Sequence, residues 1–217
     1  MKKYSGWIAA AKLLAPIAAL WAAYAFLRYV VAGPVDPAGQ PLYLVNKMIS
    51  MTALSMIAAS YILSTFGRLN PKFPRRKLAV KKQLGLGGFY LAAVHVILSF
   101  KLLGPERYGF IFGPDGSITA HTILTIAFGA AAFLVFILPA YGSIPEVARD
   151  WGPKKWKKAQ HTGYAAMALI AGHVFLMGYH KWPEPGTWHG NMPPLTMLAF
   201  VIAMGVLAYR AFWLIRR

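Results

Sequence analysis

The sequence predicts an all-α polytopic membrane protein, a bundle of six transmembrane helices with both ends of the chain in the cytoplasm. Of its 217 residues, 58% are apolar and only 13% are charged. That charged share is about half of what soluble domains carry, and it leaves too few polar groups to cover a soluble surface. Six stretches are long and apolar enough to cross a bilayer core about 30 Å thick. The composition therefore excludes a soluble globular protein and a disordered one.

The six predicted spans are separated by short segments that contain helix breakers such as glycine–proline pairs. They are predicted at Leu13–Val31, Asn46–Phe66, Leu84–Leu103, Thr119–Tyr141, Ala159–Tyr179 and Leu195–Trp213. The first resembles a cleavable signal peptide, but its apolar run continues past the small residues Ala23 and Ala25, so we expect a retained helix. No internal repeat divides the chain, and residues 1–217 are predicted to form a single transmembrane domain.

The predicted orientation follows from the distribution of lysine and arginine. The segments 68–82 and 142–158 contain seven and five of these residues, whereas the three alternate connecting segments contain only Arg107 and Lys181. Since cytoplasmic loops are enriched in lysine and arginine, both termini and the two basic segments are predicted to be cytoplasmic. We expect the basic segments to contact anionic membrane lipid, and an acidic flavoprotein or a nucleotide phosphate is a second candidate for the same surface.

Composition also excludes several classes of function. The net charge of +17 is typical of nucleic-acid-binding proteins, but the basic clusters lie between apolar spans, so no nucleic-acid partner is expected. The chain has no cysteine, which excludes disulfides, cysteine-ligated clusters and c-type haem attachment. Only six residues are Asp or Glu, so histidine is the predicted metal ligand.

His95 and His173 are the strongest candidates for such ligands. Measured from the cytoplasmic ends of the third and fifth spans, His95 lies about 16 Å deep and His173 about 21 Å deep, at 1.5 Å per residue. The two spans run parallel, so both imidazoles reach the middle-to-outer part of the membrane, where they can ligate one haem iron from opposite faces. The alternative is that each histidine forms a hydrogen bond to a neighbouring helix.

Two further residues are predicted to contact the same haem. Gly88 lies two turns before His95 on one helix face, where its missing side chain would admit a flat macrocycle, although close helix packing is an alternative. Arg107 is a candidate partner for a haem propionate, with simple solvation as its alternative. Three more histidines lie on the outer side: His121, His180 and His189. They are candidates for a redox, quinone or metal site, and the alternative is that they are ordinary interfacial residues.

His161, at the cytoplasmic edge of the fifth span, has several interpretations. It is a candidate ligand for a second, inner haem, but the third span offers only Gln83 at the same depth. Contact with a quinone, contact with a haem propionate and an ordinary interfacial position are the other interpretations.

These residues resemble a known family, that of the ferric reductase-like transmembrane domain. Its third-helix signature is similar to Arg75-Arg76-Lys77, Leu84-Gly85-Leu86, Phe89-Tyr90 and His95. Its preceding segment is similar to Asn46-Lys47 and Gly67-Arg68-Leu69, and its fifth-helix signature to Lys154-Lys155-Trp156, Tyr164 and His173. The resemblance covers approximately residues 45–210, and in size and layout the chain is similar to the haem-binding membrane subunits of the MsrQ (YedZ) group.

The resemblance implies a six-helix cytochrome b that holds haem b through histidines of its third and fifth helices and transfers electrons across the membrane. Larger members of the family add a cytoplasmic domain for flavin and nicotinamide, so here flavin is expected only through a partner. The first histidine of the family's fifth helix falls on Gln160, with His161 displaced by one residue. The resemblance therefore extends to His95 and His173 but not to this ligand.

The predicted function is that of a haem b electron-transfer subunit in a bacterial cytoplasmic (inner) membrane, an oxidoreductase component rather than a self-sufficient enzyme. Its expected donor is quinol or a cytoplasmic flavoprotein, and its expected acceptor is a periplasmic redox partner protein. One alternative is a structural or assembly subunit of a larger membrane complex, which keeps the fold without haem. Another is a small transporter with a histidine proton relay.

Overall fold

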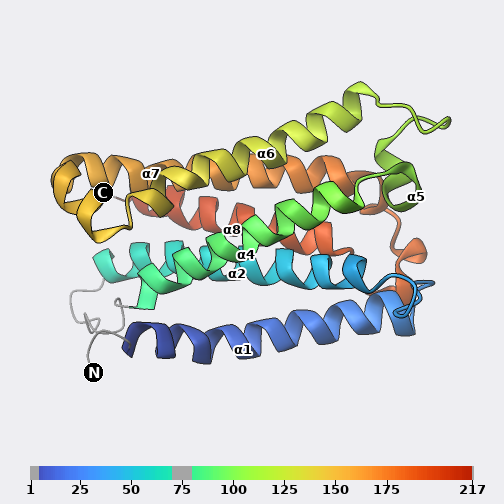
Figure 1. The fold of residues 1–217 in the computed structure, drawn as a ribbon, viewed down its shortest axis with the longest axis horizontal. Helices are drawn as coiled ribbons and strands as arrows, with labels where there is room; N and C mark the ends of the chain where they lie inside the picture. The colour runs from blue at the N-terminus through green and yellow to red at the C-terminus, as the bar shows by residue number, and fades with distance from the viewer. Residues whose placement is uncertain (1–4, 70–79, 217) are drawn as a thin grey trace.

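The computed structural model describes residues 5–69 and 80–216 and places six long helices within them (Figure 1). These are α1 (Ser5–Ala25, continued by the π-helical segment η2, Phe26–Val31), α2 (Pro41–Leu69), α4 (Val80–Leu102), α6 (Ala120–Tyr141), α7 (Pro145–Gly178) and α8 (Leu195–Ile215). Short helices connect them: α5 (Pro105–Tyr108), η3 (Gly109–Ile111), η4 (Tyr179–Lys181), η5 (Pro185–Thr187) and η6 (His189–Asn191). The described residues contain no strand, and six helical segments are long and apolar enough to cross a membrane, which confirms the predicted fold class.

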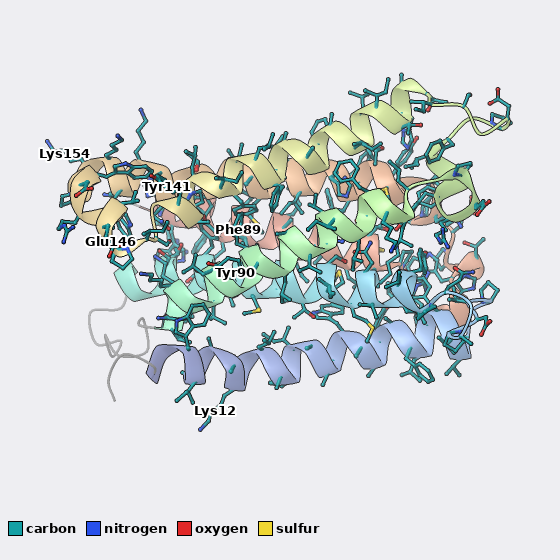
Figure 2. All side chains as sticks on the ribbon, in the orientation of Figure 1. Lys12, Phe89, Tyr90, Tyr141, Glu146 and Lys154 are labelled. Atoms are coloured by element: carbon teal, nitrogen blue, oxygen red, sulfur yellow. The ribbon has the colours of Figure 1, made fainter. Side chains whose placement is uncertain are left out.

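The helices lie side by side, with α2 near the centre of the bundle. Helix α2 contacts α1, α4 and α8, while α7 contacts α6 and α8. The start of α1 and the end of α8 lie at one end of the bundle, together with Lys154 (Figures 1 and 2). We call this the basic end, and the opposite end, where α5 and the α7–α8 connection lie, the far end. Which end faces the cytoplasm remains a prediction.

The polarity of the bundle is reversed relative to a soluble protein. Ile97 and Leu134 are 68% and 62% exposed, whereas Asn46 and Thr125 are each 1% exposed. Apolar side chains on the outside match lipid, and polar side chains inside must find partners because hydrocarbon offers none. This arrangement agrees with a multi-pass membrane protein.

The connection before the fifth span differs from the prediction. Helix α7 begins at Pro145 rather than near Ala159, so most of the segment predicted to join two spans is helical. Gly152 interrupts the helix with φ +64°, a backbone conformation that glycine adopts without steric cost, and Pro153 then fits the first turn of the continuing helix. Hydropathy did not indicate this helix because it is basic and lies outside the apolar span. Most of the other basic segment, including Arg75-Arg76-Lys77, lies outside the described residues.

At the far end, the start of α6 is bound to the loop that precedes it. The hydroxyl of Thr119 accepts a hydrogen bond from the backbone N–H of Thr122, and the hydroxyl of Thr122 accepts one from the N–H of Thr119, so the two form a capping box. Both hydroxyls also donate to the carbonyl of Ile111. Ile111 and Tyr108 are thereby held, buried, against Leu102 of α4.

The far end of α1 is bound to the α7–α8 connection by a buried arginine. Arg28, in the π-helical segment, is 5% exposed and donates hydrogen bonds to the backbone carbonyls of Met192 and His189. π-Helical turns are often found at functional sites. Here the turn contributes to the connection between α1 and the rest of the bundle.

Candidate functional site

The structure brings His95 and His173 together in one cavity of about 230 Å³ between α2, α4, α6, α7 and α8. We call it the histidine cavity. Its other lining residues are mostly aliphatic or aromatic, among them Met51, Leu54, Val96, Ile126, Phe133, Ile170, Val174, Met177 and Leu195. Two imidazoles from different helices therefore share a largely apolar pocket, as the sequence predicts.

The ring of His173 is fixed by a backbone carbonyl of α6. Its Nδ1 lies 2.8 Å from the carbonyl oxygen of Thr125. Because a carbonyl only accepts hydrogen bonds, Nδ1 carries the proton and Nε2 keeps its lone pair. A histidine bonded in this way presents Nε2 as a metal ligand with a defined ring orientation.

The ring of His95 is fixed by a buried amide of α2. Its Nδ1 lies 2.7 Å from Oδ1 of Asn46, whose Nδ2 donates to the hydroxyl of Ser99 at 3.1 Å. With the amide nitrogen directed at Ser99, the amide oxygen is the acceptor for His95, so Nδ1 donates and Nε2 again keeps its lone pair. The two histidines thus have the same protonation pattern, supported from two different helices.

The two Nε2 lone pairs of His95 and His173 fit the ligand requirement of a haem. The porphyrin supplies four nitrogens to iron, so the protein needs to add only two axial ligands, and two neutral imidazoles are a common pair. The apolar walls match the faces of a macrocycle. The residues of the histidine cavity are therefore suited to hold haem b through the Nε2 atoms of His95 and His173.

Gly129 makes room for one of these rings. A Cβ at this position would lie 2.9 Å from Nδ1 and 3.0 Å from Cε1 of His173. We expect Gly129→Ala to displace the imidazole, break its bond to Thr125 and lower haem affinity about tenfold, as loss of a supporting contact does at metal sites. Haem bound per chain, measured during a titration, checks this. Gly205→Ala on α8 is the matched control, because a Cβ there meets nothing within 4 Å, and unchanged binding in the Gly129 variant would contradict the prediction.

Gly88 has a different role from the one expected. A Cβ on it would lie 2.7 Å from Cγ1 of Ile57 and 2.9 Å from the carbonyl oxygen of Ala53, both on α2. Gly88 is buried in this helix contact and does not line the histidine cavity. Two turns below His95, the same face of α4 is already covered by α2, so the glycine serves close helix packing, the alternative that the sequence left open.

Arg107 also lies away from the cavity. It is in α5, exposed, and is not among the residues that line the histidine cavity. The neighbouring Tyr108 does line it, together with Lys47 of α2. Among the described residues, the lysine or arginine that lines the histidine cavity is thus Lys47 of α2 rather than Arg107.

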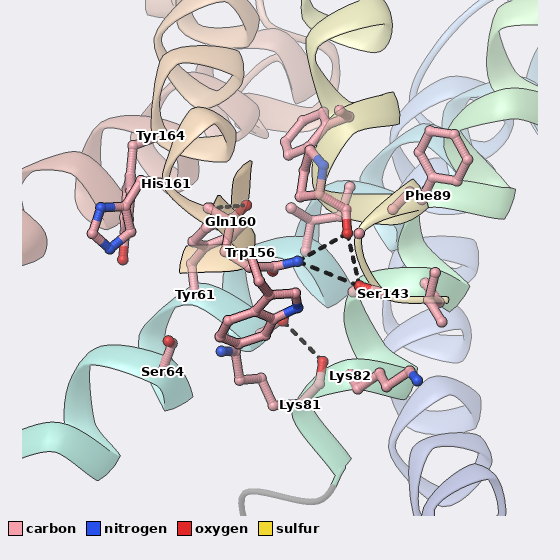
Figure 3. A pocket seen from close by; sticks show the side chains of 18 of the residues that line it. Tyr61, Ser64, Lys81, Lys82, Phe89, Ser143, Trp156, Gln160, His161 and Tyr164 are labelled. Atoms are coloured by element: carbon pink, nitrogen blue, oxygen red, sulfur yellow. Dashed lines mark hydrogen bonds between the residues drawn. The ribbon is translucent and has the colours of Figure 1, made fainter. Parts of the chain in front are cut away.

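His161 lines a second cavity, of about 400 Å³, near the basic end (Figure 3). Its ring makes an edge contact with Tyr164 at 6.3 Å between centroids. Three cations, Lys81, Lys82 and Arg210, line the same cavity. We call it the basic-end cavity. His161 is the one histidine among the described residues that line it, so the cavity presents a single imidazole rather than a pair.

Of the two glutamines at this depth, Gln160 lines the basic-end cavity and Gln83 does not. The side chain of Gln83 lies beside Gly6 of α1 and does not line the basic-end cavity. Gln160 donates a hydrogen bond of 2.9 Å to the carbonyl of Pro139, one of the carbonyls left free at the end of α6 (Figure 3). Gln160, on which the resemblance places a histidine of the ferric reductase-like family, therefore contributes to the α6–α7 contact in this chain.

The remaining histidines lie outside both cavities. His121, at the start of α6, has its ring 6.2 Å from that of Tyr179, and the ring of His180 lies 5.3 Å from that of Phe110. His189 contributes its backbone carbonyl to the hydrogen bond from Arg28. The described residues do not bring these three histidines together as one group of possible metal ligands.

Comparison with known proteins gives a distant match. No protein-family model matches the chain. It is 27% identical over 188 residues to the human protein Metalloreductase STEAP2, an alignment that covers 75% of this chain and 38% of that protein. The mouse protein of the same name is 26% identical over the same shares. The chain thus spans less than two-fifths of the length of the relatives it matches, and it is a six-helix membrane protein with distant similarity to metalloreductases.

Proposed function

We propose that this protein is a membrane electron-transfer subunit that holds one haem b between His95 and His173. The observation that carries the proposal is that the two imidazoles have the same protonation and hydrogen-bonding pattern. Each has Nδ1 bonded to an oxygen acceptor, and both line one apolar cavity. Bound there, haem would supply a carrier for one electron at a time.

The residues around the histidines would set the properties of that carrier. Asn46 and the carbonyl of Thr125 orient the rings and strengthen their donation to iron, because an imidazole that gives up part of its Nδ1 proton is a better ligand at Nε2. The apolar lining excludes water. Burial, axial ligation and these hydrogen bonds are the means by which a protein adjusts a haem potential.

Electrons are proposed to enter through the basic-end cavity. Ile57 and Phe136 line both cavities, so one layer of side chains separates them. Phe89, which lines the basic-end cavity, is stacked on Phe133, which lines the histidine cavity, with ring centroids 5.3 Å apart and an angle of 1° between the planes. This short separation supports transfer from a donor bound near the basic end.

The proposed donor is quinol or a cytoplasmic flavoprotein, and the proposed acceptor is a periplasmic redox partner. The cations Lys81, Lys82 and Arg210 favour a donor that is anionic or has an acidic surface. Location in a bacterial cytoplasmic membrane remains a prediction, since the two relatives are animal proteins. One haem is proposed, because two histidines are among the described residues that line the histidine cavity, and their Nδ1 atoms are both bonded to oxygen acceptors.

A reduced-minus-oxidised absorption spectrum of the purified protein, with haem quantified per chain, tests this proposal. We expect a b-type spectrum typical of two histidine ligands and one haem per chain. The same sample is checked for helical structure by circular dichroism. A helical, monodisperse protein that takes up no haem would contradict the proposal and favour the structural or assembly subunit. Two haems per chain would contradict the single site.

A further inference from the structure

Lys47 is a charged residue in an otherwise uncharged cavity. It lies on α2 beside Asn46 and lines the histidine cavity, where no other described lining residue has a permanently charged side chain. It is six residues from the start of α2, and His95 is seven residues from the end of α4, so both lie at a similar depth below the far end. The ammonium group and the axial ligands are therefore in the same part of the bundle.

Aromatic rings surround this ammonium group. Nζ of Lys47 lies 4.9 Å from the centroid of the Tyr43 ring and 5.4 Å from that of Tyr108. The rings of Tyr43 and Tyr108 are 6.0 Å apart, and Tyr43 also contacts Tyr29 at 6.1 Å. Tyr108 is buried in the cluster held by the start of α6. A lysine in a membrane helix usually extends its ammonium group toward the membrane interface. The ammonium group of Lys47 instead lies beside the packed rings of Tyr43 and Tyr108 at the far end of the cavity.

No carboxylate balances this charge. Among residues 5–69 and 80–216, the ion pair found within 4.0 Å joins Arg149 and Asp150, which are both exposed, and it does not involve Lys47. Ring faces attract a cation, but they replace only part of the hydration that an ammonium group loses on burial. Lys47 is partly buried, and a charge in such a place is stabilised when an anion pairs with it.

We propose that Lys47 is the carboxylate-binding group of the histidine cavity and that it pairs with a propionate of the haem. This inference rests on the proposed function. Haem b carries two propionates on one edge and apolar substituents on the others, so a single ammonium group at the far end of an apolar cavity selects one orientation of the macrocycle. Lys47 takes the role that the sequence suggested for Arg107, whose side chain is exposed at the far end.

The carboxylate that pairs with Lys47 could also come from a soluble molecule that enters from the far end. The test distinguishes such a molecule from a haem propionate. Haem b and haem b dimethyl ester, in which both propionates are blocked, are titrated into protein produced without haem. We expect the wild type to bind haem b at least tenfold more tightly than the ester. We expect Lys47→Met to remove this preference, because methionine keeps an unbranched apolar side chain of nearly the same length but has no ammonium group. Lys101→Met is the matched control, since Lys101 is exposed near the end of α4 and does not line the cavity.

A second readout is the midpoint potential of the bound haem. Removing a positive charge stabilises the ferric state, so Lys47→Met is expected to lower the potential, and Lys101→Met to leave it unchanged. Equal binding of haem b and its ester by the wild type would overturn the propionate assignment without any variant. If citrate then shifts the haem spectrum in the wild type but not in Lys47→Met, the carboxylate is a soluble one. A wild type that binds neither form contradicts the proposed function, whereas normal haem binding with no effect of Lys47→Met contradicts this inference alone.

Discussion

His95→Ala and His173→Ala are each expected to abolish the b-type spectrum. Each removes one of the two imidazoles that line the histidine cavity, and no other histidine lines that cavity among the described residues. The effect should exceed the loss of tenfold to a hundredfold in affinity that follows removal of a supporting hydrogen bond, because here the ligand itself is lost. The measurement is haem bound per chain in protein purified in the same detergent, with the absorption spectrum of whatever haem remains.

Two other histidines provide the controls. His121→Ala removes an imidazole from the far end that lines neither cavity, and His161→Ala removes the one that lines the basic-end cavity. Both variants are expected to keep the wild-type haem content. Loss of half of the haem in His161→Ala would instead support a second, inner haem. Retention of a normal spectrum in either His95→Ala or His173→Ala would show that iron is bound elsewhere.

The six spans and the pairing of the two histidines could be predicted from the sequence because both depend on properties that run along a single helix. Hydropathy over about 20 residues marks a span regardless of its neighbours. Depth in the membrane follows from the number of residues and the rise of 1.5 Å per residue. Since two parallel helices share one depth scale, His95 and His173 could be placed at one level without knowing that they line one cavity.

The supporting residues could not be predicted in the same way, because their roles depend on which helices meet. Thr125 acts through its backbone carbonyl, which every residue has. Gly129 matters because the ring of His173 crosses α6 at that point. For Gly88, the sequence left a haem contact and close helix packing both open, because spacing along α4 gives its face but does not show that α2 covers this face.

Asn46 and Lys47 could have been identified from the sequence, where they contributed only to the resemblance to a known family. Polar and charged residues inside an apolar span are costly and are therefore candidates for function. Of the residues inside the spans, only histidines were predicted to be functional on this ground, and the propionate partner was expected in a connecting segment, at Arg107. The structure places both residues in the histidine cavity, Asn46 bonded to His95 and Lys47 beside two tyrosines. Polarity within the second span could have indicated them.

Asn46→Leu is expected to have the second-largest effect on haem binding. Leucine is close to asparagine in size but cannot accept a hydrogen bond from Nδ1 of His95. The buried N–H group of His95 would therefore lose its main partner. The ring can then rotate or change its protonated nitrogen, and Nε2 no longer keeps a free lone pair directed into the cavity. We expect haem affinity to fall about tenfold to a hundredfold, measured by haem titration and by the haem retained after gel filtration.

Two companion variants separate the hydrogen bond from a general disturbance of α2. Asn46→Asp keeps an acceptor beside Nδ1 and adds negative charge, so it is expected to retain haem and to lower the midpoint potential, since a more anionic imidazole and a nearby negative charge both favour ferric iron. Ser99→Ala removes only the outer member of the network, 3.4 Å from Nδ1, and should change affinity little. If Asn46→Leu and Ser99→Ala behave alike, the amide does not orient His95. If instead only Asn46→Leu loses haem while Asn46→Asp shifts its potential, the buried amide acts on iron through the imidazole, which packing alone would not produce.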